Sequence, residues 1–113
     1  MSAEFARHIH ELLAGLGRLK TRPMFGGHGL YSDDTFFGFV LDDVLYLKAD
    51  DASRPRFLAA RLKPFVYNKR RSRNYYRAPP EALESPDAAL DWGRAALAAA
   101  LRARSRPKRK KKR

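Results

Sequence analysis

Short runs of β-favouring residues alternate with pairs of aspartates between Met24 and Lys48. Side chains of a strand point alternately to its two faces, so the run TFFGFVL in the middle predicts two sets of side chains. The aspartate pairs leave connections so short that the runs they join must lie antiparallel. We therefore expect a three-stranded antiparallel meander here. One predicted face holds Phe37, Phe39 and Leu41, and the other holds Phe36, Gly38 and Val40.

Three segments show the three- and four-residue spacing of apolar side chains that is typical of amphipathic helices. The first covers residues 3–16, and the second is a short helix that ends near Leu62. The third begins with Ser85 as a favourable N-cap and Pro86 at the first helical position, and it continues to about Arg102.

Two further strands are expected at residues 64–67 and 73–78, joined by a basic hairpin tip at residues 68–72. Pro23 cannot donate a backbone hydrogen bond, so we place it just before the first strand of the meander. The resulting order is α-β-β-β-α-β-β-α. It predicts an α+β two-layer domain, with an antiparallel sheet and the helices on one of its faces.

The formal net charge of +12 is concentrated at the C-terminal end. Residues 102–113 contain nine Lys or Arg and no acid, and removing these nine charges leaves +3 for residues 1–101. A block of like charges repels itself and buries no apolar surface. We therefore expect one folded domain over residues 1–101, followed by a disordered polybasic tail.

The composition narrows the possible classes of function. The absence of Cys excludes disulfides, thiolate metal sites and cysteine nucleophiles. No apolar run approaches the roughly 18 residues of a membrane span, so we expect a cytoplasmic protein that does not act at a membrane.

No arrangement of side chains suggests catalysis. His8 and His10 are two residues apart on a helix and so lie on different faces, and His28 stands alone among glycines. A phosphate-binding loop at Gly26, Gly27 and Gly29 is an alternative, but a close backbone approach explains these glycines better. We expect a protein that is not an enzyme and that uses no cofactor and no metal.

Nucleic acid is the favoured partner. Residues 63–77 contain six basic side chains and no acid, interleaved with four aromatic ones, which are expected to pack within the fold rather than to stack on bases. Cations at one edge of a hairpin can contact phosphates without reading the base sequence. The predicted nucleic-acid-binding residues are Lys69, Arg70, Arg71, Arg73, Arg104, Arg106, Lys108, Arg109, Lys110, Lys111, Lys112 and Arg113.

Several short segments share one family resemblance. The stretch TRPMFGGHGLY at residues 21–31 resembles the RRMFGGYGLY opening of the TfoX N-terminal domain family. Four later segments resemble the family in the same order. They are DVLYLK at 43–48, PFVY at 64–67, YYRAP at 75–79 and WGRAAL at 92–97.

The resemblance implies a secretion-chaperone-like α+β fold with the order of elements given above. It also implies a role in regulation, since the named members, TfoX or Sxy, regulate natural competence genes together with the cyclic-AMP receptor protein. At 113 residues the chain has no room for the C-terminal domain of the full-length regulators, so we expect a stand-alone domain.

Two hypotheses of function remain. The first is accessory transcriptional regulation with low-specificity binding to DNA or another polyanion, in company with a transcription factor or RNA polymerase. The second is a dimeric protein-interaction adaptor, for which Trp92 is the candidate interface residue because Trp is favoured at interface hot spots. In that case the basic tail only adds solubility.

Overall fold

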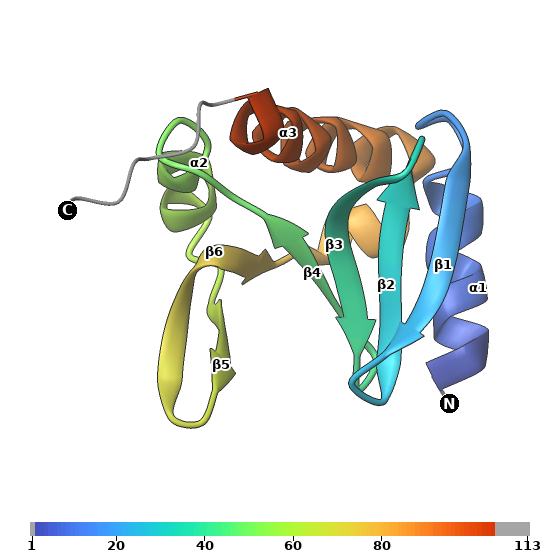
Figure 1. The fold of residues 1–113 in the computed structure, drawn as a ribbon, viewed down its shortest axis with the longest axis horizontal. Coiled ribbons are helices and arrows are strands. Elements are labelled where there is room, and N and C mark those ends of the chain that lie inside the picture. Colours follow the sequence, from blue (N-terminus) through green and yellow to red (C-terminus); the bar gives the residue numbers. More distant parts are fainter. Residues whose placement is uncertain (1, 106–113) are drawn as a thin grey trace, which may run out of the picture.

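The computed structural model describes residues 2–105 of the 113-residue chain. Its six strands form one open antiparallel sheet in the order β1-β2-β3-β4-β6-β5 (Figure 1). This confirms the predicted α+β fold class. In chain order the elements are α1 (Ser2–Leu12), β1 (Leu19–Met24), β2 (Gly27–Ser32), β3 (Thr35–Leu41), β4 (Val44–Lys48), α2 (Arg54–Ala59), β5 (Pro64–Tyr67), β6 (Arg70–Arg77), the 3-10 helix η1 (Pro80–Leu83) and α3 (Pro86–Ser105).

Four two-residue turns connect the hairpins, and both residues of each turn have positive φ. This left-handed geometry matches the twist of the strands, and Asn, Asp and Gly adopt it most readily. The turns consist of Phe25-Gly26, Asp33-Asp34, Asp42-Asp43 and Asn68-Lys69. The aspartate pairs therefore mark turns, as predicted, and the β5–β6 turn is shorter than the predicted tip.

Strand β1 was not predicted from the sequence. Pro23 was expected before the first strand, whereas it lies inside β1 and pairs with His28 of β2. Strand β1 is at the edge of the sheet, where a residue without an N–H can be tolerated because one side of the strand needs no partner. The meander consequently has four strands instead of three.

A β-bulge in β3 corrects the predicted face assignment. Leu30 pairs with Gly38 and Tyr31 with Phe36, so Phe37 is an extra residue opposite β2. Phe37 and Val40 consequently share the core, where both are fully buried. Phe36 and Phe39 lie on the other face, with their rings stacked at a centroid distance of 6.4 Å.

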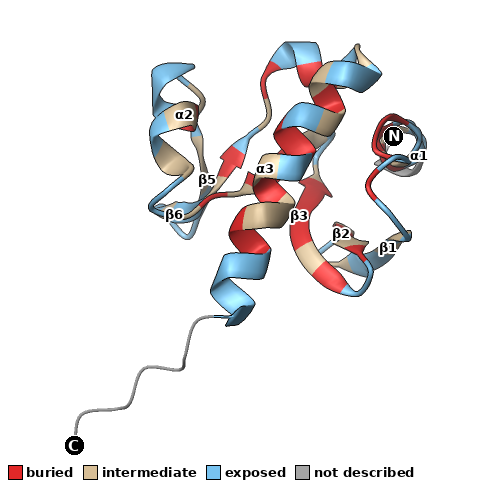
Figure 2. Ribbon diagram, turned by 90° about the horizontal axis from the view of Figure 1, so that it is seen from above, coloured by how far each residue is buried: buried red, intermediate tan, exposed pale blue. Residues whose placement is uncertain are grey.

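All three α-helices contribute to a single core on one face of the sheet, as the sequence predicted. Ile9 of α1, Phe57 of α2 and Ala96 of α3 are completely buried there against Phe37 and its neighbours. In Figure 2, buried positions recur every few residues along α3, with exposed positions between them. None of the described helices has the length and apolarity needed to cross a bilayer.

Helix α3 continues to Ser105, so residues 102–105 are helical where the sequence predicted a disordered tail. Two contacts hold this last turn against the body. Arg102 makes a bidentate ion pair with Asp50, with its Nε and Nη2 donating at 2.6 and 2.9 Å. Arg104 donates through Nη1 to the Thr35 hydroxyl at 2.6 Å. The rest of the predicted tail, residues 106–113, lies outside the described residues.

The Arg102–Asp50 pair predicts a dependence of stability on pH. The hydrogen bonds from Arg102 hold the pKa of Asp50 well below its ordinary value, against a smaller opposing effect of burial. A carboxyl with a lowered folded pKa stabilises the fold above its ordinary pKa of about 3.9, and that stabilisation is lost as pH falls through the folded value. Arg102→Gln should therefore reduce the free energy of unfolding at neutral pH and progressively less below about pH 4.

Urea unfolding at several pH values measures this difference. Lys20→Gln is the matched control, because Lys20 and Asp34 form a longer contact of 3.3 Å between exposed side chains. Such a surface pair contributes little. A difference between the wild type and Arg102→Gln that stays constant down to acid pH would contradict the assignment.

Candidate nucleic-acid interface

The β5–β6 hairpin projects from the rest of the sheet (Figure 1). It carries a cluster of cations. Lys69 lies in its turn, and Arg70, Arg71 and Arg73 follow on β6. All four residues are exposed, and none forms an ion pair with another residue in the described part of the chain. The structure thus brings together the four hairpin residues that the sequence predicted, with their charges available to a ligand.

Charge is segregated between the strands and the turns of the sheet. No strand in the described part of the chain contains an Asp or Glu. The aspartates next to these strands lie in the β2–β3 and β3–β4 turns. The only strand cation with a salt bridge among the described residues is Lys20, which contacts Asp34. The strands carry the seven cations Lys20, Arg22, Lys48, Arg70, Arg71, Arg73 and Arg77.

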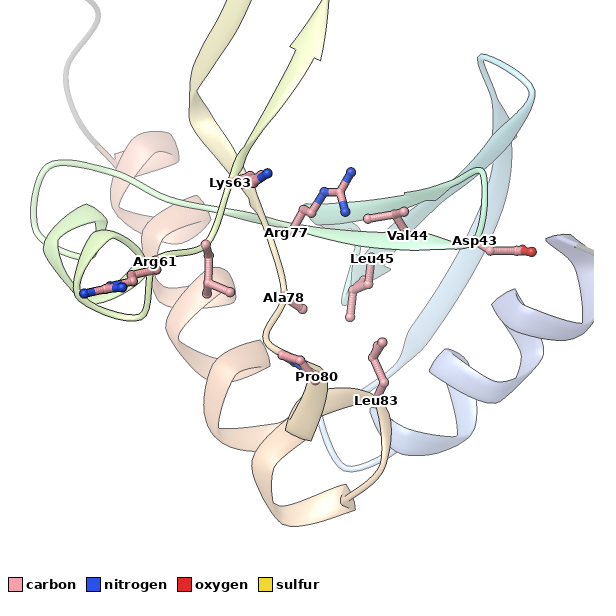
Figure 3. Close-up of a pocket in the computed structure, with 10 residues that line it drawn as sticks. Asp43, Val44, Leu45, Arg61, Lys63, Arg77, Ala78, Pro80 and Leu83 are labelled. Carbon is pink, nitrogen blue, oxygen red and sulfur yellow. The ribbon is translucent and has the colours of Figure 1, made fainter.

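A groove beside the hairpin extends the basic surface towards α2. Two hollows of about 390 and 490 Å³ share Arg61, Lys63 and Arg77 in their walls, and Arg71 lines the larger one. Figure 3 shows the smaller hollow, where Lys63 and Arg77 lie close together and Asp43 lies at the far end. Arg61, Lys63 and Arg77 were not predicted as site residues, although Lys63 and Arg77 belong to the acid-free run of residues 63–77.

The face of the sheet opposite the helices is aromatic. Seven rings form a continuous set with centroid distances of 4.9 to 6.4 Å. Phe39 and Tyr46 are buried within this set, although neither belongs to the main core. The seven rings are those of Tyr31, Phe36, Phe39, Tyr46, Phe65, Tyr67 and Tyr75.

Two cations lie over rings of this aromatic face. The Arg22 guanidinium and the Lys48 ammonium are each 5.2 Å from a ring centroid, over Tyr31 and Tyr75 respectively. A cation at this distance is attracted by the ring quadrupole. The face therefore combines π-surface with positive charge.

Trp92 is buried in the body, whereas Arg104 is exposed but is held to the body by a hydrogen bond. Trp92 is only 7% exposed, packs edge-on against Phe57 and is covered by the Arg56 guanidinium at 3.8 Å. The indole thus has little exposed surface, and its role at an interface with a protein partner stays a prediction. Arg104 is engaged by Thr35, and the other predicted tail residues, Arg106, Lys108, Arg109, Lys110, Lys111, Lys112 and Arg113, lie outside the described residues.

Two of the three histidines, His10 and His28, line one hollow of about 250 Å³, and His8 does not line it. The Nε2 atom of His8 is 2.7 Å from the Leu83 carbonyl oxygen, and the Nδ1 atom of His28 is buried without a hydrogen-bond partner among the described residues. Residues 2–105 contain no group of three or more His, Asp or Glu side chains arranged to hold a metal.

Burial of the aromatic face can be tested by titration, because it raises the pKa of Tyr75. An acid with a raised folded pKa stabilises the fold below its ordinary pKa, here about 10, and this stabilisation is lost as pH rises through the folded value. We expect tyrosinate absorbance of the folded protein to include a late component above about pH 10 that Tyr75→Phe removes. In denaturant the late component should be absent from both proteins, and its survival in folded Tyr75→Phe would contradict the assignment.

Comparisons with known proteins show the family to which the chain belongs. The chain matches the TfoX N-terminal domain family over residues 11–100. Protein Sxy of Escherichia coli (strain K12) is 46% identical over 43 residues, which cover 38% of this chain and 21% of that protein. The chain thus matches only about a fifth of this relative's length. Because the family match takes in most of the chain, this protein belongs to the TfoX N-terminal domain family.

Proposed function

We propose that this protein is a regulatory domain that binds nucleic acid through the β5–β6 hairpin and the basic C-terminal segment, residues 106–113. The observation that carries the proposal is the set of exposed hairpin cations, Lys69, Arg70, Arg71 and Arg73, which have no ion-pair partner among the described residues. Guanidinium groups meet phosphates through two parallel hydrogen bonds, and phosphate contacts fix position without reading bases.

The groove beside the hairpin supports the same conclusion. Arg61, Lys63 and Arg77 continue the positive surface from the hairpin towards α2, and among the described residues Asp43 is the only acid that lines either hollow. A polyanion that follows the hairpin would meet cations over both parts of this surface. Binding of this kind is governed by the release of counterions, so it should be strong at low salt and weak at high salt.

Family membership supports a biological setting for the proposed binding. The partial match to protein Sxy, together with the family assignment, supports accessory transcriptional regulation of the competence type. Nucleic-acid contacts with little base specificity would suit a protein that assists another DNA-bound factor or RNA polymerase, since the partner would supply the choice of site.

The contribution of the basic segment is tested by a chain that ends at Ser105. This end point keeps Arg102 and Arg104 with their partners Asp50 and Thr35, and it removes seven cations. If roughly half of these cations contact phosphates, truncation should flatten the plot of log K against log salt by about 3 for duplex DNA. Fluorescence anisotropy over about 50 to 200 mM salt measures the slope, and unchanged slope and affinity would exclude a role for the segment.

The hairpin contribution is tested by combining Lys69→Gln, Arg70→Gln and Arg71→Gln in the full chain. Each phosphate contact that is lost should weaken binding equally for all sequences and reduce the salt slope by about 1. The matched control combines Arg7→Gln, Arg18→Gln and Arg94→Gln, which removes the same charge from exposed positions elsewhere. If the control loses as much affinity as the hairpin variant, the binding reflects net charge alone and the hairpin is not the site.

A further inference from the structure

The aromatic face of the sheet has the composition of a binding surface. Of the thirteen Phe, Tyr and Trp residues of the chain, seven form the connected ring set and an eighth, Phe25, lies beside it. All three α-helices pack on the other face, and each contributes to the core there. The most peripheral rings are correspondingly open, with Phe25 83% and Tyr67 68% exposed.

The exposed rings border a small hollow at one end of this face. Phe25, Leu41, Phe65 and Tyr67 surround a space of about 250 Å³. This is below the roughly 300–1,000 Å³ of sites for drug-sized ligands, so it suits a single planar ring better than a whole cofactor. Phe65 and Tyr67 already stack at 6.4 Å with an interplanar angle of 19°, which leaves their planes nearly parallel.

Glycine shapes the other end of the face. A Cβ atom at Gly29 would lie 2.8 Å from the Met24 Sδ, 3.0 Å from the Phe36 ring and 3.3 Å from the Tyr31 ring. The missing side chain therefore lets these three residues come together into a continuous apolar surface. The ring set extends from Tyr31 at this end to Tyr67 on the hairpin.

The charges on this face favour an anionic ligand. Arg22 and Lys48 lie over two of the rings, and Lys20 is paired directly opposite Tyr31 across the strands. The strands of residues 2–105 contain no acidic residue, and the nearby aspartates occupy the turns of the meander. A second copy of the chain would bring like charges together, which disfavours a symmetric dimer through this face.

We propose that the aromatic face binds single-stranded nucleic acid by stacking unpaired bases on Phe25, Phe65 and Tyr67, with Arg22, Lys48 and the hairpin cations contacting the phosphates. This inference rests on the proposed function and names the form of nucleic acid that the domain prefers. Every base has a π-face, so stacking on aromatic side chains binds single-stranded nucleic acid with little sequence specificity. The bases inside a duplex are stacked on one another, so they have no free π-face to offer these rings.

The test compares binding of the full chain to a labelled single strand of about 12 nucleotides, within the range of known single-strand sites, and to the corresponding duplex. The single strand should bind more tightly, and Phe25→Ala or Tyr67→Ala should each weaken it by about 5- to 150-fold. Neither substitution should change duplex binding appreciably. Since both side chains are largely exposed, the fold should survive their removal.

Matched variants separate stacking from a general loss of apolar surface. Tyr67→Phe keeps the ring and should retain single-strand affinity, whereas Leu101→Ala removes an exposed apolar side chain from α3 and should have no effect. Tyr67→Trp adds a reporter, because stacking of a base should quench the fluorescence of the new indole, while the native Trp92 is shielded in the core. A ribonucleotide strand of the same sequence shows whether DNA or RNA is preferred.

The outcomes distinguish this inference from the proposed function. Equal affinity for single strand and duplex, with no effect of Phe25→Ala or Tyr67→Ala, would overturn the stacking site while leaving the hairpin proposal intact. Absence of binding to every nucleic acid would overturn both. A concentration-dependent dimer in sedimentation experiments that Phe25→Ala and Tyr67→Ala dissociate would show that a second copy covers the face, which also overturns the inference.

Discussion

The bulge in β3 is the constraint on which both faces of the sheet depend. A regular strand would direct Phe37 to the same side as Phe39 and Leu41, and the sheet would lose either a core residue or a ring from its aromatic face. The extra residue lets Phe37 and Val40 fill the core while Phe36 and Phe39 stack behind them. Gly38 makes this possible, because a Cβ atom there would lie 2.5 Å from the Tyr46 carbonyl oxygen.

Local signals in the sequence predicted much of the fold. The aspartate pairs and the Ser85-Pro86 helix start depend on the backbone preferences of the residues themselves, and the structure has turns and a helix start there. The bulge has no comparable signal, since the run TFFGFVL fits a regular strand equally well. Pro23 was misplaced for a related reason. Whether a proline can occupy a strand depends on its being at the edge of the sheet, which is a property of the whole topology.

The candidate site shows the same division between local and long-range information. Counting charges identified the hairpin cations, but it could not show that Arg102 is paired with a carboxylate 52 residues earlier. Nor could it show which of the neighbouring residues Tyr75 and Tyr76 enters the main core. The structure places Tyr76 in the main core and Tyr75 in the ring set on the opposite face. The prediction that the aromatic residues pack within the fold is thus confirmed for Tyr76, which is buried. It does not hold for Tyr67, which is largely exposed.

The contact between Arg104 and Thr35 connects the basic segment to the sheet. It holds the end of α3 beside the start of β3, one residue from Phe36 of the ring set. The chain then continues for eight residues, seven of them basic. If the aromatic face binds a nucleic-acid strand as proposed, a cationic segment attached at this point would have a high effective concentration for that strand, so modest phosphate attraction would reinforce base stacking. The phosphate contacts weaken as salt rises, whereas stacking depends on it less. Two weak interactions of different physical origin would therefore hold the same ligand over a wider range of conditions than either one could alone.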